Sequence, residues 1–182
     1  EIGIGVESGN LGLSAYDYVL TPSSTASSTL WTGLYYLVNF ANRILEAAQV
    51  YTPTTSEQDE YDAIIAHATA IRAYGHLKLL AYYTPASDYA NDDALAIPLV
   101  MEVPSIDAQP FRDTVGDVFT AILSDLSAAE ADIDTDLSLI GDANSYKTSD
   151  AITAIKAIVA AMRENYEEAK TLYKELLDKY QL

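Results

Sequence analysis

The sequence predicts an all-α fold built from helical hairpins. Apolar residues recur at spacings of three or four along five stretches, and Pro-containing or polar runs separate these stretches. The chain has 182 residues, of which 49% are apolar and 20% charged, a composition typical of a globular protein. We therefore expect one domain over residues 1–182, with an irregular lead-in at 1–27 and a long ordered loop at 84–113.

The first helix is expected to begin near Ser28 or Thr29, either of which would cap it, and to end before Pro53. Its predicted apolar stripe comprises Leu30, Leu34, Leu37, Ala41, Ile44 and Ala48. Thr and Val residues between positions 18 and 32 leave a short strand possible there.

The second helix has a capping-box spacing at its start, formed by Thr55 and Gln58. It should run to Tyr82 or Tyr83, because Pro85 follows. Its predicted stripe comprises Tyr61, Ile64, Ile65, Ala68, Ile71, Gly75 and Leu79.

Residues 84–112 show no periodicity and contain four prolines, which indicates a long loop that is either functional or packed as a strap. Thr114, with Asp117 three residues later, is the expected cap of a third helix, whose buried face would comprise Val118, Ile122, Leu126, Ala129 and Ile133. Thr148 or Ser149 should cap a fourth helix with Ile152, Ile155, Val159 and Met162 on one face, and Asn165 a fifth.

The last two helices have the pattern of a tetratricopeptide-like hairpin. Small residues are needed where the paired helices touch, and Ala157 and Ala169 supply one on each helix. Tyr173 is expected to insert into the hairpin. The usual Trp and Tyr of the first repeat helix are absent, since Thr153 and Ala160 stand there, so an ordinary helical hairpin is the alternative.

Several stretches, in order, resemble the SusD/RagB family of surface nutrient-binding lipoproteins. They are "LWTGLYYLVNFANRIL", "AIIAHATAIRAYGHLKLLAYY", "LAIPLV", "FRDTVGDVFTAILSDLSAAEADI" and "YEEAKTLYKELLDKYQL". The resemblance covers about residues 29–182. One departure is His67, where the family usually has an acid. Family members continue into a less regular half that supplies much of the ligand surface, so we expect only the helical part here.

The resemblance implies non-catalytic binding of a glycan or peptide nutrient at the cell surface, next to a SusC-like TonB-dependent outer-membrane transporter. The lipid anchor would lie in a segment outside this chain, which begins without Met and contains no Cys. The alternative is a tetratricopeptide-like adaptor that binds a protein or peptide partner in a helical groove. A groove lined by tyrosines and acids would favour the adaptor, and an aromatic platform near the loops would favour glycan binding.

Aromatic residues in or beside loops are the candidate ligand-binding residues, since flat rings suit the C–H faces of sugars. They are Tyr16, Tyr18, Trp31, Tyr82, Tyr83 and Tyr89. For the loop tyrosines the alternative is that they cover the core. Trp31 shares a helical face with Tyr35, Val38 and Asn42, and for this face we expect packing against the second helix, with Asn42 fixing a loop.

Other functions are disfavoured by composition and spacing. The net charge of −17 repels nucleic acids and anionic membranes. The absence of Cys excludes thiolate chemistry, and no apolar run is long enough to span a bilayer. Arg72, within an apolar stretch, should pair with a carboxylate such as Asp125.

No metal site, cofactor or catalytic residue is expected. His67 and His76 are nine residues apart on one helix and should face opposite ways. Asp132, Asp134 and Asp136 have the spacing that opens a calcium-binding loop, but the glycine and closing glutamate of such a loop are replaced by Leu137 and Ala143.

Overall fold

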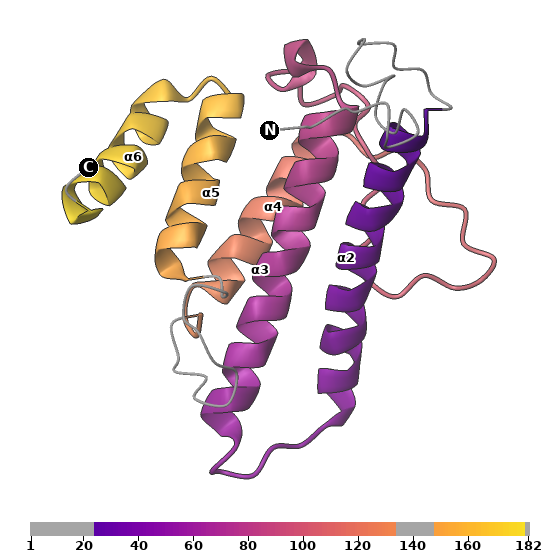
Figure 1. Ribbon diagram of the computed structural model, residues 1–182, viewed down its shortest axis with the longest axis vertical. Coiled ribbons are helices and arrows are strands. Elements are labelled where there is room, and N and C mark those ends of the chain that lie inside the picture. Colours follow the sequence, from indigo (N-terminus) through magenta and orange to yellow (C-terminus); the bar gives the residue numbers. More distant parts are fainter. Residues whose placement is uncertain (1–23, 134–147, 181–182) are drawn as a thin grey trace, which may run out of the picture.

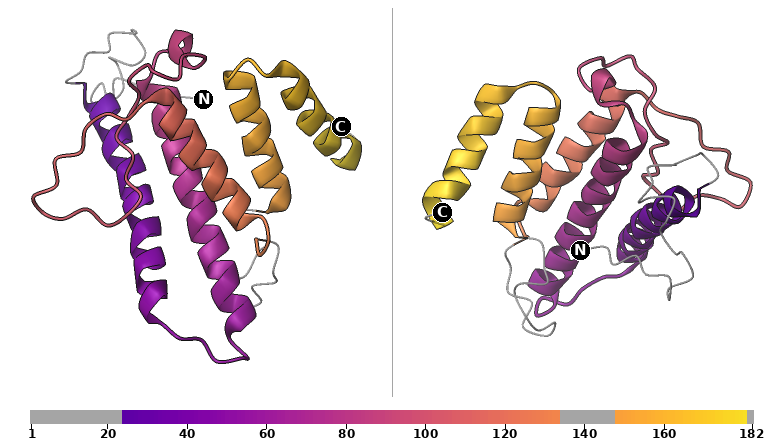
Figure 2. Two further views of the ribbon diagram at one scale, coloured as in Figure 1. Left: turned by 180° about the vertical axis from the view of Figure 1, so that it is seen from behind. Right: turned by 45° about the horizontal axis from the view of Figure 1, so that its top comes forward.

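The computed structural model describes residues 24–133 and 148–180, and every regular element within these ranges is helical. The α-helices are α2 (Thr25–Val50), α3 (Gln58–Tyr83), α4 (Val115–Ala129), α5 (Ser149–Met162) and α6 (Tyr166–Tyr180), and a short 3₁₀ helix, η2, spans Ala86–Asp88. Each α-helix packs against the next one in the chain, so the helices form a curved row from α2 to α6 (Figures 1 and 2). The predicted all-α fold is confirmed.

The start of α2 lies earlier than the sequence indicated. Ser24 occupies the N-cap position, and Ser28 lies inside the first turn, where its hydroxyl donates to the Thr25 carbonyl (3.1 Å). The predicted caps at Ser28 and Thr29 are therefore wrong. The short strand left possible between positions 18 and 32 is absent from 25–32, because this part is helical, and residues 18–23 lie outside the described residues.

The capping interaction before α3 is displaced by one residue from the predicted pair. The backbone N–H and the hydroxyl of Thr54 both donate to the Glu57 carboxylate, at 2.8 and 2.7 Å. Gln58, predicted to cap, instead donates to Asp62 one turn later. The sequence offers two adjacent pairs with capping-box spacing, Thr54 with Glu57 and Thr55 with Gln58. The first pair forms because the charged carboxylate accepts stronger hydrogen bonds than a neutral amide.

Helix α3 lies between α2 and α4 and is therefore buried on most of its circumference. Alanines such as Ala66, Ala70 and Ala73 let the neighbouring backbones approach closely. The single-sided stripe predicted for this helix is wrong in part, since Ile64 is 39% exposed. The stripe predicted for α2 is also wrong in part. Ala41 is buried as predicted, but Leu30 and Ile44 are exposed, and Val38 and Asn42, which lie outside the predicted stripe, are buried.

Gly75 marks the closest approach between α2 and α3. A Cβ atom at this position would lie 2.7 Å from Cγ2 of Val38, well inside van der Waals contact. The missing side chain thus sets the distance between the two longest helices. Glycine inside a helix costs up to about 1 kcal/mol relative to alanine, which this contact must offset.

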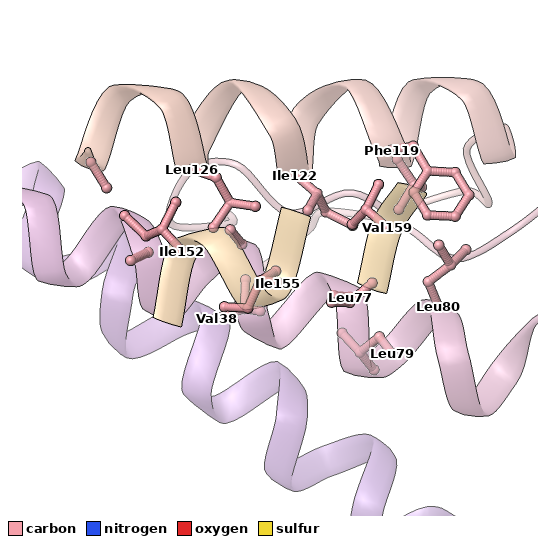
Figure 3. Packing of buried hydrophobic residues seen from close by; sticks show 14 of the residues in the cluster. Val38, Leu77, Leu79, Leu80, Phe119, Ile122, Leu126, Ile152, Ile155 and Val159 are labelled. Atoms are coloured by element: carbon pink, nitrogen blue, oxygen red, sulfur yellow. The ribbon is translucent and has the colours of Figure 1, made fainter. Parts of the chain in front are cut away.

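For α4 and α5, the predicted buried faces and the predicted N-cap residues are confirmed. Thr114 accepts from the Asp117 amide (3.1 Å), and Thr148 accepts from the Ala151 amide (3.3 Å). The predicted apolar face of α4 is buried throughout, and Figure 3 shows Phe119, Ile122 and Leu126 meeting α3 and the α5 residues Ile152, Ile155 and Val159.

Helices α5 and α6 form the expected hairpin, with Ala157 and Ala169 both buried. The Asn165 carbonyl accepts from the Ala169 amide (3.0 Å), which places Asn165 at the helix start as predicted. Tyr173, however, is 39% exposed, so its predicted insertion into the hairpin is wrong. Leu172 and Leu176 are half-buried instead, so the face of α6 that meets α5 includes Leu172 and not its neighbour Tyr173.

Residues 84–113, called the strap below, connect α3 to α4 and run across the outside of α2 (Figure 1). The strap contains η2, and one isolated antiparallel bridge joins its residue Leu95 to Thr114, the N-cap residue of α4. Side chains hold it at both ends: Arg112 donates to the Ala96 carbonyl (2.6 Å), and Arg163 from the α5–α6 turn donates to the Tyr89 carbonyl (3.1 Å). Ala96 and Ile97 of the strap are buried, whereas most residues from 101 to 112 are exposed, including Ile106 and Phe111, so only part of the long loop expected at 84–113 is packed.

Candidate functional site

An open groove lies between the first half of α2 and the strap. It encloses about 360 Å³ and is largely apolar. Its lining comprises Trp31, Thr32, Tyr35, Tyr36, Asn39, Pro98, Val100, Pro104 and Pro110. This aromatic groove thus combines rings from one rigid helix with prolines from the strap, and the helical spacing of Trp31, Tyr35 and Tyr36 brings all three rings to one side.

The aromatic side chains of the groove are held by one another and by the strap. The centroid of the Trp31 ring lies 4.8 Å from the ring centroid of Tyr35 and 4.8 Å from that of Tyr83. The Trp31 and Tyr83 rings meet at an interplanar angle of 86°. The Tyr83 hydroxyl donates to the Ser27 carbonyl (2.6 Å), and the Tyr35 hydroxyl donates to the Pro98 carbonyl (2.8 Å). Such edge-to-face packing fixes the rings before any ligand arrives.

The hydroxyl of Tyr35 is used to bind the strap and is not free to contact a ligand. Burial raises the pKa of this phenol above its ordinary value, and the nearby Asp113 carboxylate raises it further. Its hydroxyl therefore stays protonated and committed to the strap. Tyr36, one residue on, is 61% exposed and leaves its ring accessible at the rim of the groove.

A buried polar network anchors the strap behind the groove. Arg72 forms a two-pronged ion pair with Asp125, with both N–O distances at 2.8 Å, which confirms the pairing predicted from sequence. The same guanidinium donates to the Asn42 side chain (3.0 Å) and to the Met101 carbonyl (2.8 Å). Residues from α2, α3 and α4 thereby converge on one stretch of strap backbone.

Asn42 and His76 complete this network. The Asn42 amide donates to the carbonyls of Val100 (2.7 Å) and Glu102 (3.0 Å), so it fixes a loop as the sequence indicated. His76 accepts from the Val100 amide through Nε2 (3.2 Å). Burial lowers the pKa of His76 to about 4, which keeps the ring neutral and able to accept this bond at pH 7.

The structure brings together only some of the candidate ligand residues. Trp31 lines the groove, and Tyr83 packs behind it. Tyr82 is 61% exposed and does not line the groove, while Tyr89 is buried edge-on against Phe119 at 6.2 Å. Tyr16 and Tyr18 lie outside the described residues.

The groove residues that were not among the sequence-based candidates include all four that the strap supplies, namely Pro98, Val100, Pro104 and Pro110. Pro98, Pro104 and Pro110 come from a segment without periodicity, whose path cannot be read from spacing. Tyr36 was also missed, although it follows Tyr35 directly. The signal that was available was Asn42, which was expected to fix a loop, but the sequence did not indicate which loop.

No group of three or more His, Asp or Glu side chains within the described ranges is arranged to hold a metal ion. Of the aspartates with calcium-loop spacing, Asp134 and Asp136 lie outside those ranges. No described helix is both long enough and apolar enough to cross a membrane.

The sequence matches the model of a SusD-like family described as "Starch-binding associating with outer membrane", over residues 7–157. No curated protein matches significantly.

Solved structures with a similar fold include the following three. A putative sugar binding protein from Bacteroides vulgatus is 26% identical, with a TM-score of 0.69 over 83% of this chain and 33% of the other. A SusD superfamily protein from the same species is 18% identical, with a TM-score of 0.78 over 92% and 37%. A laminarin binding SusD-like protein is 17% identical, with a TM-score of 0.67 over 93% and 33%. The chain thus spans about a third of the length of each.

Proposed function

This chain belongs to the SusD-like family, and we propose that it is the helical part of a carbohydrate-binding protein of the cell surface that captures glycans without catalysis. The aromatic groove is the observation that carries the proposal. It offers an exposed Tyr36 ring and a fixed Trp31 ring, with the polar side chains of Thr32 and Asn39 beside them. Sugar C–H faces stack on such rings, and sugar hydroxyls bond to such polar groups.

The charge of the chain supports a neutral ligand. A protein with a net charge of −17 repels anionic ligands, whereas neutral glucans are unaffected. The described relatives agree in class: one is named a putative sugar binding protein and another a laminarin binding protein. Starch and laminarin are both glucans, so a glucan is the first ligand to test.

The groove by itself should bind weakly. Its volume of about 360 Å³ is near the lower end of ligand pockets, which range from roughly 300 to 1,000 Å³. We expect millimolar affinity from these residues, and further ligand surface in the remainder of a full-length relative. Within the same proposal, the protein is held at the outer membrane by a lipid on a preceding segment and hands its ligand to a SusC-like TonB-dependent transporter, as the family description of outer-membrane association supports.

The test uses Trp31 as its probe, because it is the only tryptophan in the chain. Titration with maltoheptaose and with laminarihexaose should change Trp31 fluorescence with a millimolar dissociation constant for at least one of them. Tyr36→Ala should weaken this binding about two- to tenfold.

Tyr82→Ala is the matched control, because Tyr82 and Tyr36 are both 61% exposed and only Tyr36 lines the groove. Tyr82→Ala should leave the titration unchanged. No fluorescence change with either glucan, or equal weakening by both variants, would contradict the assignment to this groove. Micromolar affinity would show that these residues hold a more complete site than we propose.

A further inference from the structure

A second groove lies at the opposite end of α2. Figure 1 shows the α2–α3 turn that closes the helical hairpin at this end. It encloses about 350 Å³. Its lining includes Ile44, Tyr51, Glu57, Glu60, Tyr61 and Ile64. The two grooves share no lining residue, and their nearest lining residues on α2, Asn39 and Ile44, are five residues apart, which corresponds to about 7.5 Å along the helix. The tip groove is therefore separate from the aromatic groove.

The floor of the tip groove is an exposed apolar surface. Ile44 is 43% exposed and Ile64 39% exposed, and they come from the two facing helices. The rings of Tyr51 and Tyr61 lie beside them, 6.0 Å apart and inclined by 31°. The Tyr61 hydroxyl donates to the Ala48 carbonyl (2.8 Å), which holds that ring in place. A ligand therefore meets a surface that is already formed.

The rim of the tip groove is acidic. Glu57 accepts two hydrogen bonds from Thr54, one from the backbone N–H and one from the hydroxyl. Both bonds lower the pKa of Glu57 below its ordinary value, and the backbone bond has the larger effect. No salt bridge joins Glu57 or Glu60 to a cationic side chain among the residues that the structure describes. Asp59 and Asp62 add further negative charge on the first turns of α3.

Lysine and arginine side chains have the chemistry that complements this groove. Their aliphatic stems suit the isoleucine floor, their charge suits Glu57 and Glu60, and a cation over a tyrosine ring is attracted as well. A second copy of this chain is a poorer occupant, because both copies carry a net charge of −17.

We propose that the tip groove docks a basic, partly apolar peptide segment of a partner protein. Because the tip groove and the aromatic groove share no lining residue, a glycan and a short peptide segment can be bound at the same time. The combination of tyrosines and acids is also the feature that the adaptor interpretation of the sequence required.

The experiment measures binding of two short peptides, Ac-LRALKRL-NH₂ and Ac-LEALEEL-NH₂, by NMR of the intact chain. The basic peptide should shift the Ile44 and Ile64 methyl signals and the Tyr51 ring signals, and the acidic peptide should not. Glu60→Gln and Ile64→Ala should each weaken binding of the basic peptide about two- to fivefold, as expected for a partly exposed charge pair and for lost apolar contact.

Matched controls separate a groove from general charge attraction. Asp178→Asn removes the same charge from the exposed surface of α6, and Ile158→Ala removes the same apolar group from α5, where Ile158 is 41% exposed. Both should leave the affinity unchanged. Equal weakening by Glu60→Gln and Asp178→Asn, absence of basic-peptide shifts, or the same shifts produced by maltoheptaose would each overturn the proposal.

Discussion

At the scale of single residues, Arg72 shows how one side chain ties several segments together. Its guanidinium bonds to Asp125 on α4, to Asn42 on α2 and to the strap carbonyl of Met101. The side chains of Arg72 and Asp125 are only 13% and 8% exposed. Removing one partner of a buried ion pair leaves the other charge buried and uncompensated, which costs more free energy than the intact pair contributes.

The first prediction follows from this burial. Asp125→Ala should lower the free energy of unfolding by about 3–5 kcal/mol, because Arg72 would remain buried and unpaired. Glu130→Ala breaks the surface pair with Lys156, whose glutamate is 48% exposed, and should cost less than about 1 kcal/mol. Urea denaturation of both variants checks the difference, and equal costs would show that Arg72 finds another partner.

The second prediction concerns His76, whose folded-state pKa is lowered to about 4, first by burial, while the unfolded value is near 6.5. The unfolded chain therefore binds the proton more readily between these values, so stability falls as pH falls. Between pH 7 and pH 5 the loss should be about 2 kcal/mol. Denaturation at both pH values checks this, and His76→Gln should reduce the pH dependence; an unaltered dependence in the variant would exclude His76 as its source.

At the scale of whole elements, periodicity predicted α4 and α5 well because each buries one face. Val118, Ile122 and Leu126 are all buried as expected. The same reasoning failed for α3, because its buried residues are spread over most of the helix circumference, and many of them are alanines, which carry little hydrophobic signal. Spacing therefore indicated that α3 exists but not that it lies at the centre.

The candidate site was predictable only where it depends on helices. Trp31 lies on α2, and its inclusion in the groove follows from a helical face. The prolines of the strap have no periodic signal, so which of them meets Trp31 depends on the path of a loop held by Arg72 and Asn42. Those two side chains were identified from sequence, but the position of the backbone they hold was not.

The third prediction concerns the contact between α2 and α3. Gly75→Ala should destabilise the protein by about 1–3 kcal/mol, because its Cβ would lie 2.7 Å from Val38 Cγ2, even though alanine favours helix. In the double variant Val38→Ala/Gly75→Ala the clash is absent, so the combined cost should be smaller than the sum of the single costs. Simple additivity in thermal or urea unfolding would show that the helices separate without penalty.

At the scale of the whole molecule, the large negative net charge of −17 dominates the electrostatics. The chain has 27 acidic and 10 basic residues, so its charges repel one another over most of the surface. Among the described residues, exposed ion pairs such as Lys156–Glu130 and Lys179–Asp150 act in the opposite direction. Each exposed pair contributes at most about 1 kcal/mol.

The fourth prediction is that added salt stabilises this protein. At 0.1 M ionic strength the screening length is about 10 Å, so salt removes repulsion between acids on different helices far more completely than attraction within a pair in direct contact. The paired groups lie at 2.8 Å in Lys156–Glu130 and at 2.6 Å in Lys179–Asp150. A gain of about 1 kcal/mol would raise Tm by about 2–4 °C for a chain of this size. Calorimetry in 10 mM and 300 mM NaCl, repeated with KCl to exclude a specific ion, checks this. A falling Tm would mean that surface pairs outweigh the repulsion of the net charge.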